Sequence, residues 1–548
     1  MKTSGHRLAL AGLAVAIVAL AIGSMRLDTA TDDEPAHLAA GMVKLVHGRL
    51  DYFRAQPPLM NTISAIPLVI AGYELAPGWS PYKRDHWAVG THFLYRSGYD
   101  AQRILFLARL PTVAMLLALC FAVYWFVRRE SGSVWGGVAA FALTGFCPNL
   151  MAHGRLATVD LAVTFFSFAA AALMIVMIET GSYRVAPLAG IAAAAAILSK
   201  SSGNLLGPYF IALLLVAFLM RRVPDAKRLW IGFAIAIATA LAFASALILI
   251  EGSASYMRER FPDVPRLLVP LAEYRATIQA IRGWYAGSQG MPQFLLGEFS
   301  PDGWGHYFLV ALFLKTPIPA ILLVIAGIVA GARRIRFPVV ALLLFAAMFL
   351  AAASLGRLDL GVRHVLPIYP FVYAAVMISL VNALTQKALT QKAARRSSIG
   401  VIAPMVILIG WHIAENVRAY PSYIAYFNQA VGSHRNADRF LIDSNLDWGQ
   451  DLRRLEQWTR REGVQSIAVH YFGGGNVSYE FGNDPRRVRA YTPDQGRLPK
   501  GWLAVSRHFY RLSFAPNVWR VDYDTLLEQA RARYVTSIGG SIDVYFIE

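Results

Sequence analysis

Apolar runs of about twenty residues recur along the first three quarters of the chain, and they constrain its fold more than any other feature. A helix of that length spans about 30 Å of hydrocarbon. Charged residues make up only 16% of the 548 residues, hydrophobic residues make up 56%, and the mean hydropathy is +0.44. These proportions exclude an ordinary soluble protein. The sequence therefore predicts a polytopic α-helical membrane protein.

Eleven of these runs are predicted to be transmembrane helices. Their expected ranges are residues 7–24, 103–127, 133–150, 159–179, 185–199, 204–220, 229–250, 306–331, 337–355, 364–384 and 399–416. The first run has no convincing small-residue cleavage site, so it is predicted to remain as a helix rather than to act as a signal peptide. A further apolar stretch, residues 57–75, is interrupted by Pro57, Pro58 and Pro67. It is predicted to be a kinked helix that lies in the membrane interface.

Basic residues cluster between alternate apolar runs. The clusters are Arg128-Arg129, Arg221-Arg222 with Lys227-Arg228, Arg333-Arg334 with Arg336, and Lys387, Lys392, Arg395 and Arg396. The positive-inside rule places such clusters in the cytoplasm, so the net charge of +18 does not call for a nucleic-acid partner. With the N-terminus also inside, the loops at 25–102 and 251–305 and everything after 416 are predicted to lie outside.

The composition changes to a soluble pattern near residue 421. Strand-like stretches such as "QSIAVHYF" and "GWLAVS" alternate with helix-like stretches such as "DLRRLEQWTRREG". Residues 1–420 are therefore predicted to form the membrane domain, and residues 421–548 a small extracytoplasmic α/β domain. The motif "DSNLDWGQDLRRL" lies near the start of this second domain, and its pattern does not indicate a function for the domain.

Ionisable residues collect at the predicted outer ends of the apolar runs. A carboxylate such as Asp33 is suited to removing a proton from an acceptor, and the cations Lys200, Arg363 and Lys315 are suited to holding a phosphate. The further candidates are Glu34, His37, His153, Asp160 and His364. Charges beside membrane segments are costly, which favours a functional site. The alternatives are a solvated acidic loop, a lysine that snorkels, and side chains that cap helices.

The order and spacing of four motifs resemble a known family. They are Asp33-Glu34 after the first helix, "QPPL" at 56–59, "HGRLATVDLAVTFF" at 153–166, and "GVRHVLPIYPF" at 361–371. Over residues 7–420 the chain resembles the membrane-embedded glycosyltransferases of the C superfamily (GT-C). The most similar branch is that of the protein O-mannosyltransferases and the lipid A aminoarabinose transferases.

This resemblance implies an inverting glycosyltransferase. The enzyme would move a sugar from a polyprenyl-phosphate-linked donor to an acceptor on the outer face of the membrane. Asp33 would be the catalytic base, Glu34 would organise the site, and Asp160 would be a polar or metal-proximal group. Lys200 and Arg363 would contact the carrier phosphate. The acceptor would be a protein, lipid A or another glycan or lipid.

The sequence also departs from the family pattern. Many relatives have His or Lys before the proline pair and Gly-Lys after the leucine, whereas Gln56 precedes this pair and Met60-Asn61 follow Leu59. The resemblance implies no definite cofactor. Some relatives bind a divalent metal, but the sequence contains no ligand spacing that defines a metal site, so metal binding is left as an alternative. The composition favours a bacterial plasma membrane. The alternative functions are a transporter or flippase of lipid-linked sugars, and a scaffold that binds partners.

Overall fold

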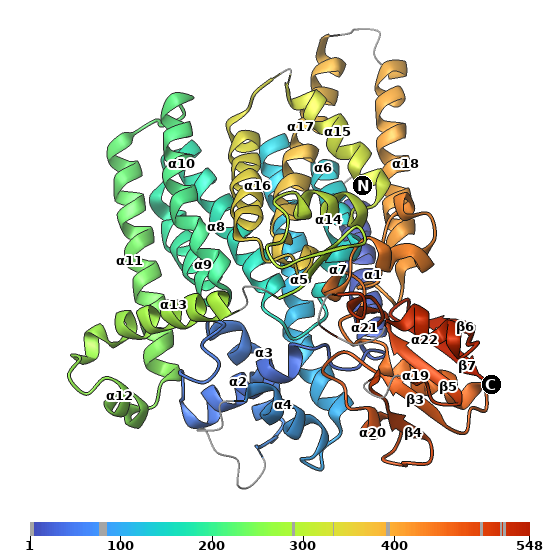
Figure 1. The fold of residues 1–548 in the computed structure, drawn as a ribbon. Coiled ribbons are helices and arrows are strands. Elements are labelled where there is room, and N and C mark those ends of the chain that lie inside the picture. The colour runs from blue at the N-terminus through green and yellow to red at the C-terminus, as the bar shows by residue number, and fades with distance from the viewer. Residues whose placement is uncertain are drawn as a thin grey trace.

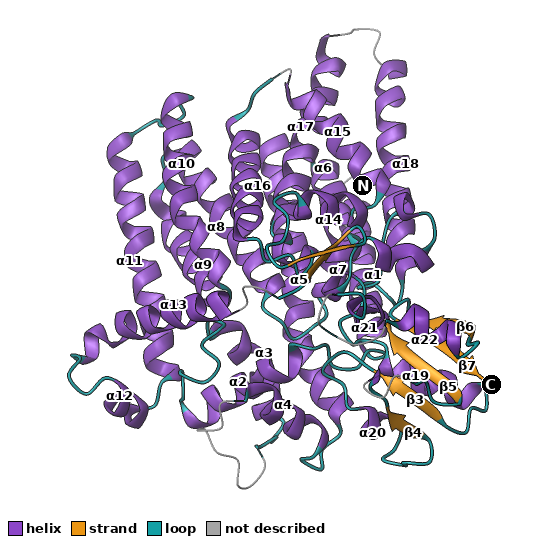
Figure 2. Cartoon of the chain, in the orientation of Figure 1, coloured by secondary structure: helices purple, strands orange, loops and turns teal. Residues whose placement is uncertain are grey.

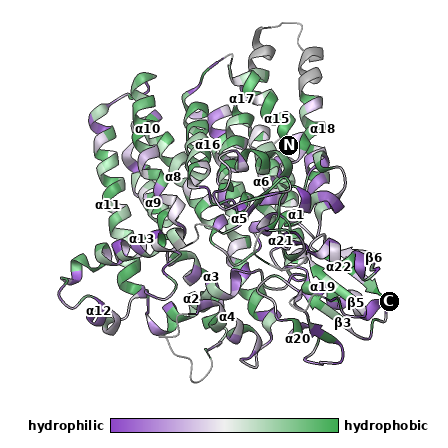
Figure 3. Cartoon of the chain, in the orientation of Figure 1, coloured by the Kyte–Doolittle hydropathy of each residue, from purple (hydrophilic) through white to green (hydrophobic). Residues whose placement is uncertain are grey.

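The computed structural model describes residues 5–75, 85–287, 291–332, 334–390, 395–493, 497–515, 518 and 522–548. Its long helices run side by side, while several short helices and a sheet gather at one end of them (Figure 1). The apolar helices of this bundle, long and short, are α1 (Gly5–Met25), α5 (Ala101–Ser131), α6 (Val134–Gly145), α8 (Asp160–Thr180), α9 (Ala186–Ser199), α10 (Leu206–Leu219), α11 (Ala226–Glu251), α14 (Tyr307–Lys315), α15 (Ile318–Ala332), α16 (Phe337–Gly356), α17 (Ile368–Thr390) and α18 (Arg395–Ala419). Hydrophobic residues dominate this helical part (Figure 3).

Each of the eleven predicted spans coincides with a helix or with a pair of helices, but fewer of them are long and apolar enough to cross a membrane. Seven helices in the described part of the chain meet that test, or eight if one bent pair counts as a single span. α6 has 12 residues and α9 has 14, so neither alone matches the thickness of a bilayer. The side chains of residues 386–401 lie outside the described set, so the start of α18 and its basic cluster are not placed.

The predicted span at 306–331 is broken rather than continuous. It consists of α14 and α15, which meet at an angle of 113°. Thr316 between them is extended, with φ −89° and ψ 131°. Pro317 follows it, and a proline disfavours helical geometry in the residue before it. Averaged hydropathy conceals this break, because the sequence on both sides of it is equally apolar.

The segments predicted to share the outer face lie at one end of the helical bundle (Figure 1). α2 (Glu34–His47), α3 (Leu59–Ile70) and α4 (His86–Tyr95) belong to the first loop, and α12 (Ala254–Arg260) and α13 (Val269–Gly287) to a later one. Arg54 joins the two loops through an ion pair with Glu273 at 2.8 Å. At the opposite end, Arg336 Nη1 donates a hydrogen bond to the Glu130 carbonyl, which brings two of the basic turns together.

The first loop packs closely because two glycines allow helices to touch. A Cβ on Gly41 of α2 would lie 2.1 Å from the Asn61 carbonyl oxygen of α3. A Cβ on Gly90 of α4 would lie 1.9 Å from the Pro35 carbonyl oxygen of α2. α2 is therefore held between α3 and α4 by backbone contact. α3 is a helix of 12 residues, short for a membrane span, in the stretch predicted to lie in the interface.

The C-terminal part contains a mixed sheet with the strand order β4-β3-β5-β7-β6 (Figure 2). Its strands are β3 (Ile467–His470), β4 (Val488–Ala490), β5 (Gly501–Ser506), β6 (Arg533–Ile538) and β7 (Ile542–Ile547). β3 pairs in parallel with β4 and β5, and β7 pairs in antiparallel with β5 and β6. The helices α19 (Leu452–Arg461), α21 (Arg507–Leu512) and α22 (Tyr523–Gln529) accompany it. The predicted class, a helical membrane protein with a small α/β region, is confirmed.

Candidate active site

Asp33 occupies the N-cap position of α2, in the loop that follows α1. Its backbone is near-helical, with φ −80° and ψ −23°, and its side chain makes no capping hydrogen bond. The carboxylate is therefore free to face Arg363, whose Nη1 lies 3.1 Å from Asp33 Oδ2. About a quarter of the Asp33 side chain, 24%, stays exposed. Water and an acceptor can thus reach a carboxylate that is already placed beside a cation.

Arg363 is the centre of the site. It lies in the 3₁₀ turn Val362–Val365 (η4), which precedes α17. Its Nη1 is also 3.8 Å from Asp160 Oδ2, and its Nε donates a 3.0 Å hydrogen bond to Ser444 Oγ. The guanidinium carbon lies 4.4 Å from the ring centre of Trp448. A cation–π contact and three polar neighbours thus fix the plane of the guanidinium.

Lys200 and Asp160 complete a chain of alternating charges. Asp160 is the first residue of α8, where the positive end of the helix dipole favours a carboxylate. Lys200 follows α9, and its Nζ donates a 2.5 Å hydrogen bond to Asp160 Oδ1. Asp160 Oδ2 has no hydrogen-bond partner among the described residues. The structure therefore brings four predicted site residues from four parts of the chain into one array, Asp33–Arg363–Asp160–Lys200.

Glu34 points away from this array and into the protein. Its fully buried carboxylate accepts hydrogen bonds from Arg109 Nε at 2.8 Å and Nη2 at 2.6 Å, and from the Thr31 and Ala157 backbone amides. Burial opposes ionisation, but the Arg109 guanidinium and these hydrogen bonds hold the pKa of Glu34 below its usual range. With its acceptor positions occupied, Glu34 anchors the start of α2 and leaves the neighbouring Asp33 to face the site.

A cavity of about 450 Å³ begins beside the array. Lys200 and His364 supply ionisable side chains to its lining, Ser201, Ser202 and Asn204 supply further polar groups, and its walls come mainly from α10, α14 and α16. The walls are mainly apolar; they include Leu205, Phe308 and Phe349. A molecule with a charged head and a hydrocarbon tail matches this combination of surfaces.

Lys315 does not join the array, contrary to the prediction that it contacts a phosphate. Its buried Nζ donates to the Ile424 carbonyl at 2.8 Å and to the Asn445 carbonyl at 2.5 Å, and it lies 4.4 Å from the Phe427 ring centre. These partners engage two of the three N–H donors of the ammonium group. The carbonyl group of Lys315 itself, at the break between α14 and α15, accepts from Asn149 Nδ2 at 2.7 Å. Lys315 therefore ties the break to the C-terminal part of the chain.

The three candidate histidines surround the array without sharing one role. His37 Nδ1 donates a 2.7 Å hydrogen bond to Asn61 Oδ1, so the residue at which the sequence departs from the family is a structural partner of His37. His153 packs edge-on against Trp448, with 5.8 Å between the ring centres. Burial, together with Lys200 and Arg363, holds the pKa of His364 well below its ordinary value. His364 is therefore neutral, and its buried Nε2 lacks a hydrogen-bond partner among the described residues.

Asp32 is a site residue with an unusual ionisation. Burial and the neighbouring carboxylates of Asp33 and Asp443 raise its pKa to about 7, although Arg363 opposes the shift. Its backbone amide donates a 3.0 Å hydrogen bond to the Trp448 carbonyl. Asp32 therefore changes charge near neutral pH at a position from which it acts on both Asp33 and Arg363.

Comparison with known proteins supports the family resemblance seen in the motifs. A family described as dolichyl-phosphate-mannose-protein mannosyltransferase matches residues 103–248, which include Asp160 and Lys200. The oligosaccharyltransferase AglB from Archaeoglobus fulgidus, solved with an inhibitory peptide and a dolichol-phosphate, superposes with a TM-score of 0.50 at 14% identity. That match covers 100% of this chain and 74% of the archaeal one.

The chain has the GT-C fold. The matched family covers about a quarter of the chain, and the superposition on AglB shows the fold. ArnT from Cupriavidus metallidurans, solved with undecaprenyl phosphate, is also similar, with a TM-score of 0.45, 14% identity, and 99% of this chain and 98% of that chain covered. No curated protein sequence matches the chain.

The candidate site is completed by a segment whose function was not predicted, residues 443–451 of the "DSNLDWGQD" motif. Ser444 and Trp448 contact Arg363, as described above. Asn445 Oδ1 accepts from the Val362 amide at 2.9 Å, and Thr29 Oγ1 donates to the Gly449 carbonyl at 2.9 Å. The dense polar composition of the motif was a signal, but no pattern in the sequence links it to residues more than 80 positions away.

Arg109 is a second residue that the sequence interpretation missed. It lies inside the predicted span 103–127, and a buried arginine in an apolar run is itself a signal for a specific partner.

No group of three or more His, Cys, Asp or Glu side chains in the described ranges is arranged to hold a metal ion. We therefore derive no catalytic step through a metal.

Proposed function

We propose that this protein is an inverting glycosyltransferase that transfers a sugar from a polyprenyl-phosphate-linked donor to an acceptor on the outer face of a bacterial plasma membrane. One observation carries the proposal. The array Asp33–Arg363–Asp160–Lys200 combines an accessible carboxylate with two cations, and it lies beside a mainly apolar cavity.

The cavity and the cations suit the donor. Its isoprenoid chain would lie between α10, α14 and α16, and its phosphate beside Lys200, Arg363 and the neutral His364. Asp33 and Ser444 accept hydrogen bonds from Nη1 and Nε of Arg363, which leaves Nη2 for a phosphate oxygen. Charge-assisted hydrogen bonds from arginine to phosphate are strong where water is scarce. The dolichol-phosphate bound to AglB, which has the same fold, supports a lipid-phosphate donor.

Asp33 would act as the general base. Its carboxylate takes the proton from an acceptor hydroxyl or amine while that oxygen or nitrogen forms a bond to the anomeric carbon. The bond between the anomeric carbon and the phosphate oxygen breaks, and its electron pair leaves with the lipid phosphate. Lys200 and Arg363 stabilise the charge that develops on that phosphate. Attack on the face opposite the phosphate inverts the configuration of the sugar.

The proposed side of the membrane rests on the distribution of charge. The first loop, with α2, and the C-terminal sheet lie at one end of the bundle, and the turn between α10 and α11, which carries a basic cluster, lies at the other end (Figure 1). The positive-inside rule then assigns the array to the outer face and the N-terminus to the cytoplasm.

A transporter of lipid-linked sugars would instead place its charges near the middle of the membrane on broken helices. The broken pair α14–α15 satisfies the Lys315 carbonyl with Asn149, so it supports no ion site there.

The test is transfer of labelled sugar in membranes. Membranes that contain the wild-type protein are expected to move radiolabelled sugar from polyprenyl-phosphate donors into an acceptor fraction, and the labelled fraction then identifies the acceptor class. Asp33→Asn should abolish this transfer at equal protein level. Asp302→Asn, on an exposed turn, is the matched control and should transfer normally. Equal transfer by the wild type and Asp33→Asn would contradict the proposal.

A further inference from the structure

A second and larger cavity lies apart from the array. It has a volume of about 790 Å³, within the range of small-molecule sites. One side is formed by the end of α18 and the chain that follows it, and the other by β6 and the turn that leads to β7. We call it the α18–β6 pocket. Neither the donor cavity nor the residues of the array contribute to its lining.

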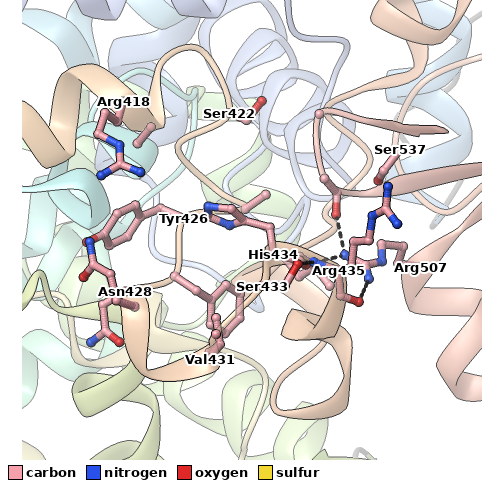
Figure 4. A pocket seen from close by; sticks show the side chains of 18 of the residues that line it. Arg418, Ser422, Tyr426, Asn428, Val431, Ser433, His434, Arg435, Arg507 and Ser537 are labelled. Atoms are coloured by element: carbon pink, nitrogen blue, oxygen red, sulfur yellow. Dashed lines mark hydrogen bonds between the residues drawn. The ribbon is translucent and has the colours of Figure 1, made fainter.

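Cations converge on this pocket from both sides. Figure 4 shows Arg418 on one side and Arg435 with Arg507 on the other, with His434 between them. Glu415 is the one carboxylate among the described lining residues, and Arg507 is paired with Asp438 and Asp543, which do not line the pocket. Arg418 has a side chain that is 74% exposed, and Arg435 makes no ion pair with a described carboxylate. Burial, followed by the charges of Arg418, Lys315 and Arg507, holds the pKa of His434 below its usual value.

Arg507 builds the wall that presents Arg435. Its buried guanidinium donates hydrogen bonds to the carbonyls of His434 at 2.9 Å and Gly540 at 3.2 Å, and also to the carbonyl of Arg435. Its charge is balanced by Asp438 at 2.7 Å, behind the pocket. The guanidinium carbon of Arg435 then lies 5.0 Å from the ring centre of Tyr534 on β6. The backbone of Arg435 is therefore held by Arg507, and its exposed side chain lies against Tyr534.

Glu415 does not cancel these charges. Its Oε1 accepts hydrogen bonds from Trp411 Nε1 at 3.0 Å and Gln429 Nε2 at 2.7 Å, and its Oε2 accepts from Tyr426. Its ion pair with Arg418 is long, at 3.6 Å. The rest of the lining offers hydroxyls, amides and aromatic faces; Ser422, Ser433, Asn428 and Tyr426 are examples. Such a surface suits a ligand with many hydroxyl groups and a negative charge.

We propose that the α18–β6 pocket binds a phosphate-bearing saccharide, with Arg418 and Arg435 as the phosphate-binding residues. Planar guanidinium groups match phosphate oxygens, and the neighbouring hydroxyl and amide groups match sugar hydroxyls. The two arginines lie on opposite sides of the pocket, with His434 between them (Figure 4), so each presents a guanidinium to a phosphate on its own side. This site is separate from the donor site and holds whether or not the array transfers sugar.

The pocket shares a wall with the array. Leu446 lines the pocket. Ser444 and Trp448, each two residues away from Leu446 in the sequence, contact Arg363. Lys315 connects the same wall to the membrane helices through the Asn445 and Ile424 carbonyls. A ligand in the pocket would therefore contact the same chain segment, residues 444–448, that orients Arg363.

Binding of glucose 6-phosphate and of glucose to the full chain in phosphatidylcholine nanodiscs tests the proposal. Ligand-observed NMR should show that the wild type prefers glucose 6-phosphate. Arg418→Gln and Arg435→Gln should each weaken that binding about tenfold, which corresponds to about 1.4 kcal/mol. Arg439→Gln, an exposed arginine of the same 3₁₀ segment that does not line the pocket, should bind as the wild type does.

Lys200→Gln separates this site from the donor site. Glucose 6-phosphate should bind to Lys200→Gln as it does to the wild type, even where sugar transfer is lost. Loss of binding in Lys200→Gln but not in Arg435→Gln would overturn the proposal, as would equal binding of glucose and glucose 6-phosphate, or an equal loss in Arg439→Gln. Failure of sugar transfer in every preparation would leave these binding results intact.

The same experiment identifies the source of the phosphate. Nanodiscs that also contain phosphatidylglycerol offer an anionic phosphate headgroup with hydroxyl groups, whereas the phosphate of phosphatidylcholine is neutralised by its own choline. If a membrane-anchored ligand occupies the pocket, these nanodiscs should weaken binding of glucose 6-phosphate to the wild type but not to Arg418→Gln. If a free saccharide is the ligand, binding should not depend on the lipid. Either result keeps the phosphate site and names its source.

Discussion

At the scale of single residues, the orientation of Arg363 determines what the site can do. Asp33 and Ser444 bind two different nitrogens of the guanidinium, and the Trp448 ring lies against its face. A guanidinium held on three sides loses little freedom when it binds a phosphate, so it contributes more of its interaction energy to the donor. Ser444 and Trp448 are therefore positioning residues, because they act through Arg363.

Ser444→Ala tests this positioning role. Removing the acceptor of Arg363 Nε should raise the KM for the lipid donor about tenfold, since a hydrogen bond to a charged group contributes about 1.5–3 kcal/mol. The kcat should fall less than the KM rises. Ser478→Ala, an exposed serine in the same C-terminal part, is the matched control. An unchanged KM in Ser444→Ala would show that Arg363 is held without it.

Asp32 predicts a dependence on pH. Its pKa is raised to about 7, so the carboxyl is protonated in acid and becomes charged as the pH rises through 7. The ionised form competes with the donor phosphate for Arg363. The KM for the donor should therefore rise between about pH 6 and pH 8, and kinetics over that range would show an inflection. Asp32→Asn should abolish the inflection; an Asn variant that keeps it would assign the titration to another group.

Asp33 and Glu34 are adjacent but should respond differently to substitution. Glu34→Gln leaves the buried Arg109 without its countercharge, and breaking a buried ion pair costs about 3–5 kcal/mol. Thermal unfolding in detergent should show a large loss of stability. Asp33→Asn should leave the unfolding temperature nearly unchanged, because its carboxylate is partly exposed. Equal destabilisation by the two variants would argue against their separate roles.

At the scale of secondary-structure elements, the position of Asp33 depends on how α2 packs. Gly90 of α4 touches the Pro35 carbonyl of α2, two residues from Asp33. Gly90→Ala should force α4 away from α2, and should reduce both sugar transfer and the unfolding temperature. Gly283→Ala on α13 meets no atom within 4 Å and should be harmless. If Gly90→Ala transfers sugar as the wild type does, the close packing of α2 is not needed to place Asp33.

The elements were predictable to the extent that apolar runs define helices. The break between α14 and α15 was not predicted, because hydropathy does not register the backbone restriction that Pro317 imposes. The folded C-terminal strands were predictable from short runs of β-forming apolar residues such as "SIAVH" and "WLAV".

At the scale of the whole molecule, the C-terminal part completes the site rather than standing apart from it. Asp28 at the end of the first helix region pairs with Arg454 at 2.5 Å, and the Thr29 amide donates to the Gln450 carbonyl at 3.0 Å. That Asp33, Asp160, Lys200 and Arg363 share one side of the membrane could be expected, because basic clusters between alternate apolar runs define the opposite, cytoplasmic side. The Ser444 and Trp448 partners of Arg363 could not be predicted from the sequence, because a contact between residues 363 and 444 depends on tertiary packing that no local pattern records.

The most direct test of Asp33 as base is single-turnover transfer with purified protein and a labelled polyprenyl-phosphate sugar. Asp33→Asn should bind the donor with an affinity near that of the wild type, because Lys200 and Arg363 remain. It should transfer the sugar about 10²–10⁴-fold more slowly, the usual contribution of a general base. Transfer at the wild-type rate by Asp33→Asn, or loss of donor binding without a change in the transfer step, would contradict the role of Asp33.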